Sequence, residues 1–201
     1  MSDFGGLISR IADDVNRTDI NSQISQQIQG AIRHYRTFPF WFNEARSTLT
    51  ASSSASFLTV PSDYLDTVEL YIKVGGHPLR MTPAPLDEVV GNRPTAGSQP
   101  GKYCYFGDRF ELDYEVNQQY EFPLYYIKEL ATLSASTDTS LWTTTGEDLI
   151  VFRAEKMIYS QVLKDKKAAA DCAVLEREAR NSLLRFRDQK TGTGYAKPWC
   201  G

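Results

Sequence analysis

The sequence predicts an α+β protein in which helices from both ends of the chain form one bundle around an inserted, antiparallel β-rich region. Apolar residues recur at helical spacing before residue 40 and again after Ile150, whereas short segments rich in β-branched and aromatic residues fill the middle. The 201 residues are 41% hydrophobic, which is enough for a folded core. The predicted parts are N-terminal helices (1–46), the β-rich region (47–130), C-terminal helices (131–188) and a flexible tail (189–201).

The first part of the chain predicts two amphipathic helices. One apolar stripe runs from Leu7 to Val15, and a second runs from Ile20 to Tyr35 with apolar residues mostly four positions apart. Asp19 is the expected N-cap of the second helix, because its carboxylate can accept hydrogen bonds from the first turn. Pro39, inside the aromatic cluster 38–42, is expected to end that helix.

The middle of the chain predicts strands joined by two tight hairpins. Gly75-Gly76 and Gly107-Asp108 lie between paired segments, where residues that tolerate positive φ form the turn. A short helix is expected at 85–90, followed by an exposed loop at 91–101. The expected strands are 57–60, 67–74, 79–81, 102–106, 110–114 and 121–129.

The helical period returns after a Ser/Thr-rich stretch at 133–145. One apolar stripe extends from Ile150 to Val162, and another extends from Ala168 to Phe186 and includes Leu175. The second helix is expected to end before the Thr/Gly run at 191–194. Helices at both termini therefore flank the β-rich region.

The composition excludes several classes. The chain has no run of about twenty apolar residues and no basic leader followed by an apolar stretch, so it is expected to be made in the cytoplasm, with no membrane association. The cysteines Cys104, Cys172 and Cys200 are too scattered for a disulfide framework, and reduced thiols are expected.

Charge is unevenly distributed along the chain. Residues 153–190 carry ten Lys/Arg and six Asp/Glu, whereas the remainder carries twelve and nineteen. This polarity is typical of subunits that make oriented contacts with partners, and it is equally typical of ordinary solvated helix faces. Both interpretations remain open from the sequence.

No catalytic or cofactor-binding motif was found, and no cofactor or metal is expected. The chain lacks a phosphate-binding loop and a GxGxxG motif. Its only histidines, His34 and His77, are too few and too far apart in the sequence to predict a two-histidine metal motif or a serine-hydrolase triad. The serious rival is glycoside hydrolysis by paired carboxylates, as in a tail-associated cell-wall hydrolase. The candidate pairs are Glu147 with Asp148, Asp63 with Asp66, and Glu111 with Asp113.

Four phrases of the sequence, in their order, resemble the head-to-tail adaptors of tailed bacteriophages, including the tail accessory factors of short-tailed phages. They are the helix and aromatic cluster at 28–43, FLTVPSDYLDTVELYI at 57–72, PGKYCYFGDRFELDY at 100–114, and the segment 125–162 with Leu133-Ser134, Trp142 and an acidic helix start. The resemblance covers roughly residues 18–188. The chain departs from the family at 115–119, where prolines are common.

The resemblance implies a structural, non-enzymatic protein of the virion neck. It implies a ring, expected to contain twelve copies, that docks on the portal protein, meets the tail nozzle or another tail protein, and surrounds a channel for DNA ejection. Double-stranded DNA would pass through without sequence-specific binding, since an acidic or neutral wall repels phosphate. A connector placed lower in the tail is the structural alternative.

The C-terminal tail is the expected anchor on the portal. Its glycines and threonines form a tether, and aromatic and basic residues often dominate interface energies. The alternative is a frayed tail that makes no contacts. A Trp near the terminus argues against this alternative, because its large side chain is poorly suited to permanent exposure to solvent. The expected portal-binding residues are Arg185, Arg187, Tyr195, Lys197, Pro198 and Trp199.

Overall fold

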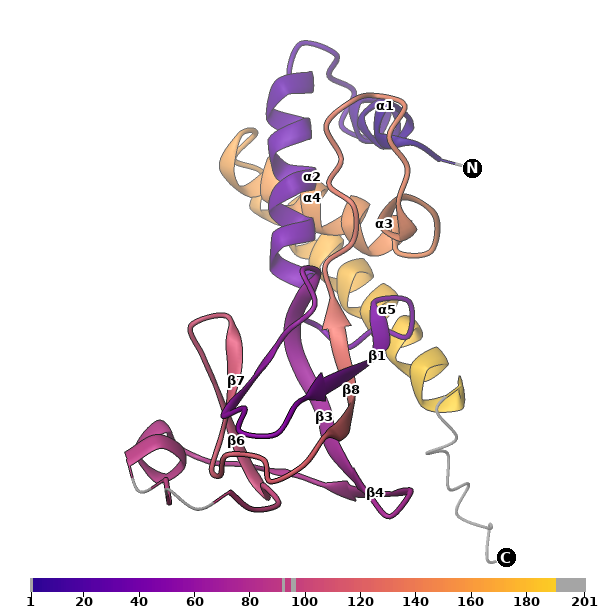
Figure 1. The fold of residues 1–201 in the computed structure, drawn as a ribbon. Helices are drawn as coiled ribbons and strands as arrows, with labels where there is room; N and C mark the ends of the chain where they lie inside the picture. Colours follow the sequence, from indigo (N-terminus) through magenta and orange to yellow (C-terminus); the bar gives the residue numbers. More distant parts are fainter. Residues whose placement is uncertain (1, 92, 95–96, 191–201) are drawn as a thin grey trace, which may run out of the picture. The chain divides into compact units, whose positions relative to one another are not determined.

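The computed structural model describes residues 2–91, 93–94 and 97–190 and shows an α+β fold, which confirms the predicted fold class (Figure 1). The chain forms two compact units. The helical unit contains residues up to Asn43 and those from Leu130 onward, and the β-unit is Glu44–Glu129. Of the predicted tail, 189–201, the first two residues belong to the last helix, and residues 191–201 lie outside the described residues.

The helical unit joins the two ends of the chain. It contains α1 (Phe4–Asp14), α2 (Asn21–Tyr35), the short α3 (Leu141–Thr144), α4 (Glu147–Gln161) and α5 (Lys166–Lys190). The α4 helix packs against both α2 and α5. The apolar stripes explain this arrangement, because Leu7, Ile24 and Ile158 are completely buried in one common core.

The aromatic cluster after α2 closes this core. Phe40 is fully buried and stacks on Phe42 with ring centroids 5.4 Å apart. Both rings meet the edge of Trp142, at 6.0 Å for Phe40 and 5.1 Å for Phe42. These contacts fasten the end of α2 to α3 across about one hundred residues of sequence.

The N-cap prediction for α2 is wrong. The Asp19 carboxylate accepts two hydrogen bonds from the Arg17 guanidinium, at 2.6 and 2.7 Å, and Ile20 occupies the cap position without a side-chain hydrogen bond. A bidentate pair with arginine satisfies the carboxylate locally, so the amides of the first turn lose their expected acceptor.

The β-unit contains two four-stranded sheets. The first has the order β1 (Glu44–Ala51), β8 (Tyr120–Lys128), β3 (Tyr64–Val74) and β4 (His77–Arg80). The second has the order β2 (Phe57–Thr59), β7 (Arg109–Leu112), β6 (Lys102–Phe106) and β5 (Thr82–Pro83). All pairings between adjacent strands are antiparallel except β5 with β6.

Both predicted hairpins are present. Gly75 and Gly76 have φ of 58° and 83° between β3 and β4, and Gly107 and Asp108 have φ of 58° and 60° between β6 and β7. The segment expected to form a short helix at 85–90 contains a single π-helical turn, η1 (Asp87–Gly91). β1 was not predicted as a strand.

Candidate interaction surfaces and buried charge clusters

The C-terminal end of α5 exposes a large aromatic side chain. Phe186 is 52% exposed, although the apolar stripe predicts it on the buried face, and Leu175 is also exposed. The buried face of α5 follows Cys172, Glu176 and Leu183 instead, and the two exposed residues flank it. Phe186 is therefore a surface feature that periodicity alone assigned to the core.

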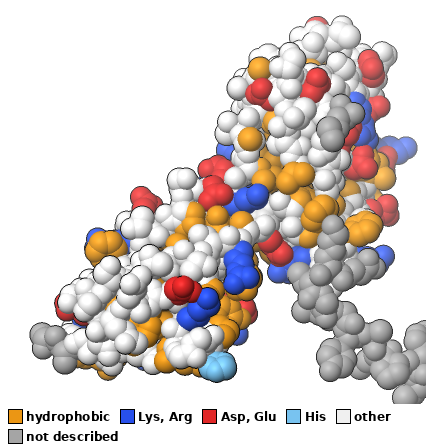
Figure 2. Space-filling model, turned by 45° about the vertical axis from the view of Figure 1, so that its right-hand side comes forward, with side chains coloured by type: hydrophobic (Ala, Val, Ile, Leu, Met, Phe, Trp, Pro, Cys, Tyr) orange, Lys and Arg blue, Asp and Glu red, His pale blue; other side chains and the backbone are white. Residues whose placement is uncertain are grey.

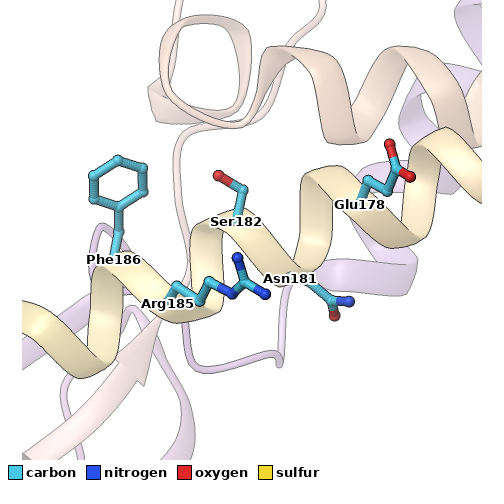
Figure 3. A pocket seen from close by; sticks show the side chains of 5 residues that line it. All are labelled: Glu178, Asn181, Ser182, Arg185 and Phe186. Atoms are coloured by element: carbon cyan, nitrogen blue, oxygen red, sulfur yellow. The ribbon is translucent and has the colours of Figure 1, made fainter. Parts of the chain in front are cut away.

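Phe186 is one of five residues of α5 that line a surface hollow (Figure 3). Figure 3 shows Glu178, Ser182 and Phe186 projecting from one side of α5, with Arg185 and Asn181 beside them. Of the predicted portal-binding residues, Arg185 lines this hollow and Arg187 lies one residue after Phe186. Tyr195, Lys197, Pro198 and Trp199 lie outside the described residues.

The β-unit also has an exposed apolar region. An open hollow of about 550 Å³ is lined by residues of β3, β6 and the segment around β5, among them Val68, Leu86 and Tyr105. These three side chains are 38%, 38% and 48% exposed. Figure 2 shows hydrophobic side chains at the surface of each unit.

The carboxylates that were candidates for hydrolysis have structural partners. At the start of α4, Glu147 and Asp148 pair with Arg10 at 3.0 and 2.9 Å, where acidic groups also offset the helix dipole. Buried Glu111 pairs with Arg93 at 2.8 Å and Arg109 at 2.6 Å. The remaining three accept hydrogen bonds: Asp63 from Tyr126, Asp66 from the amide of Thr67, and Asp113 from the amide of Gly101.

The two histidines belong to different units, His34 to α2 and His77 to β4. Within the part of the chain that the structure describes, no cluster of three or more His, Cys, Asp or Glu side chains is suited to a metal ion. The described helices include none that is long and apolar enough to span a membrane. Cys104 and Cys172 are free thiols.

One buried carboxylate of the helical unit is surrounded by cations. Glu176 of α5 is 5% exposed and accepts hydrogen bonds from Tyr35 Oη at 2.5 Å, Arg153 Nη1 at 3.0 Å and Lys156 Nζ at 2.8 Å. Burial opposes its charged form, but these three donors outweigh burial and hold the pKa of Glu176 below its ordinary value. The cluster joins α2, α4 and α5.

A second buried carboxylate has no cation bound to it in the described chain. Glu155 of α4 is 5% exposed; its Oε1 has no hydrogen-bond partner, and its Oε2 lies 3.8 Å from Cys172 Sγ. Burial, reinforced by the nearby carboxylate of Asp14, raises the pKa of Glu155 to about 8. Burial also raises the pKa of the Cys172 thiol to about 11. Both glutamates lie on the buried stripe of their helices, since Glu155 is four residues after Val151 and Glu176 is four residues after Cys172. Helical spacing could therefore have indicated their burial, but not the groups that surround them.

These features describe an α+β protein with exposed aromatic side chains on each unit. The chain belongs to a family of phage adaptor proteins: the family model described as SU10 adaptor protein matches residues 2–195. This match confirms the resemblance to phage adaptors, and it makes the chain a component of the virion. No curated protein matches the chain.

Proposed function

We propose that this adaptor forms a ring, of twelve copies, in the neck of the virion between the portal protein and the tail. The observation that carries the proposal is the adaptor family match over nearly the whole chain. The ring docks on the portal, meets a tail protein on its other side, and leaves a channel through which DNA is ejected without sequence-specific binding. Its role is binding without turnover.

The distribution of charge supports ring formation. The β-unit contains seven Lys/Arg and twelve Asp/Glu, whereas the rest of the chain contains fifteen and thirteen. A head-to-tail ring closes through two different and complementary faces on each subunit. An acidic unit and a slightly basic unit on the same chain supply such a difference.

The end of α5 supports the proposed portal contact. Phe186 offers apolar area, and Arg185 beside it offers a planar, charged donor group. Aromatic and arginine side chains are the residues that most often dominate interface energies. We place the portal anchor on Arg185, Arg187 and the tail residues Tyr195, Lys197, Pro198 and Trp199.

The test is light scattering of the purified chain, alone and mixed with purified portal. It compares the full chain, a chain ending at Gln189, and the full chain carrying Tyr195→Ala and Trp199→Ala. The proposal predicts a ring on the portal with the full chain only. The double variant is the matched control for tail length, because it keeps the tether and removes the anchors.

Other outcomes decide against parts of the proposal. A truncated chain that binds as well as the full chain removes the anchor from the tail. Failure of all three chains to bind removes the portal as partner. A ring that binds purified tail proteins but no portal assigns the chain to a connector lower in the tail.

A further inference from the structure

A small pocket on the helical unit has more positive charge than its own carboxylate balances. It has a volume of about 210 Å³ and lies among α2, α4 and α5. Four cationic side chains and one carboxylate line it: Arg153, Lys156, Arg177 and Arg180 around Glu176. His34 lines it as well.

The carboxylate of Glu176 already has three hydrogen-bond donors within the chain. It is bound by Arg153 and Lys156 in ion pairs of 3.0 and 2.8 Å, and by the hydroxyl of Tyr35. Among the described residues, neither Arg177 nor Arg180 has a carboxylate partner, and Nε of Arg180 is buried without a hydrogen-bond partner. A buried donor left unsatisfied is destabilising, and an incoming acceptor relieves that cost.

The electrostatic effect on His34 is consistent with this excess. Burial lowers the pKa of His34, and the charges of Arg153, Lys156 and Arg180 lower it further, against the opposing effect of Glu176. The pocket therefore disfavours another cation and favours an anion.

We infer that this pocket binds an oxyanion, the carboxylate of an acidic side chain on a second copy of the chain. Guanidinium groups donate in a fork that matches the two oxygens of a carboxylate. The carboxylate comes from the β-unit of the second copy, which has an excess of five negative charges and an exposed Asp87 that has no partner among the described residues. This choice of source rests on the proposed ring, in which copies are neighbours.

The first experiment tests the pocket on the free full-length chain, with acetate as the probe. Histidine resonances are followed by NMR while acetate replaces chloride at constant ionic strength. Acetate is expected to raise the pKa of His34, and the resonances of His77, in the β-unit, serve as the reference that acetate does not shift. If His34 does not respond, the anion site is refuted, whatever the chain does with the portal.

Variants sharpen this test. Arg177→Gln with Arg180→Gln is expected to weaken acetate binding by about tenfold or more, through loss of two charge-assisted hydrogen bonds. Lys166→Gln with Lys167→Gln removes the same charge from exposed positions of the same helix and is expected to keep acetate binding unchanged. Equal loss in both double variants shows a general charge effect and overturns the site.

The second experiment tests the source of the carboxylate. The two double variants are added to portal and their rings are measured by light scattering. Loss of the ring with the arginine variant alone supports a carboxylate from a neighbouring copy. A ring unaffected by the arginine variant, with acetate displaced by a short DNA duplex, assigns the pocket to DNA phosphate and overturns the second-copy source. If the unmodified chain forms no ring, the proposed function fails, while the acetate result still decides the pocket.

Discussion

The two units bury carboxylates in different ways. In the β-unit, Glu111 lies between Arg93 and Arg109, so two ion pairs balance the negative charge of its carboxylate. The helical unit buries two: Glu176 among cations, and Glu155 beside a thiol and another carboxylate. A buried carboxylate without a cation is held neutral by its surroundings. The helical unit therefore depends on pH through a group that has no counterpart among the buried residues described in the β-unit.

The units also differ in how their cores are assembled. The β-unit is one continuous segment, 44–129, in which two hairpins combine with pairings between strands that are distant in sequence, such as β1 with β8. The helical unit instead combines residues from both ends of the chain. Because each unit has its own hydrophobic core, we expect a substitution that destabilises the core of one unit to leave the packing of the other unit unchanged.

The largest expected effect is on the helical core. Trp142→Ala removes a fully buried ring that packs on Phe40 and Phe42, and it is expected to cost about 4 kcal/mol of unfolding free energy. Urea unfolding gives the loss, and hydrogen exchange followed by mass spectrometry locates it in peptides of the helical unit.

The matched variant is Phe110→Ala in the β-unit, where the removed ring is also fully buried. It is expected to increase exchange in peptides from 44–129 and to leave Trp fluorescence unchanged in the native state, because Trp41, Trp142 and Trp199 all lie outside that segment. If either substitution loosens both units equally, the cores are not separate.

The next effect concerns pH. Since burial raises the pKa of Glu155 from its ordinary 4.5 to about 8, the folded state holds a proton that the unfolded state releases between these values. The stability contributed by this group is complete below pH 4.5 and is lost as the pH rises toward about 8. Glu155→Gln is therefore expected to stabilise the protein by roughly 2 kcal/mol at pH 9 and to change little at pH 4.

Thermal unfolding from pH 4 to pH 9 measures this difference. Glu178→Gln, at an exposed position of α5, is the control and should follow the unmodified chain at every pH. A Glu155→Gln curve parallel to that of the unmodified chain would show that Glu155 is ionised in the native state.

A smaller effect is expected in the β-unit, at the β3–β4 hairpin. Gly76 has a φ of 83°, so Gly76→Ala is expected to cost about 1 kcal/mol through backbone strain, with no clash since no atom lies within 4 Å of the added Cβ. Gly91→Ala, also in open space but without a positive φ, is the control. Chemical denaturation that ranks the two variants equally would contradict the strain argument.

The smallest expected effect is at the surface of the helical unit. Arg10 pairs with Glu147 and Asp148, and its side chain is 35% exposed. Arg10→Gln is expected to cost about 0.5 kcal/mol at low salt, and less at high salt because ions screen exposed pairs. Denaturation at two salt concentrations checks this, and a loss independent of salt would indicate packing as the cause.

Local chemistry explains what was predictable in the fold. Positive φ at Gly75-Gly76 and Gly107-Asp108 follows from residue type, and the helices near 4–14 and 21–35 follow from apolar spacing. β1 escaped prediction because Glu44–Ala51 has few large apolar residues and becomes a strand by pairing with β8 at the edge of the sheet. The Asp19 cap failed because Arg17 competed for the same carboxylate.

The sequence by itself therefore determined the α+β class, the four long helices, both hairpin turns and the family of phage adaptors to which the chain belongs. Only the tertiary structure decided which polar side chains are buried together and which apolar ones stay at the surface. Helices α2, α4 and α5 bring Tyr35 together with Arg153 and Glu176, which lie more than one hundred residues after it in the sequence. Periodicity assigns each residue of a helix to one face of that helix. The side chains packed against that face come from segments distant in sequence, and these neighbours determine how deeply a residue is buried and what pKa an ionisable group has.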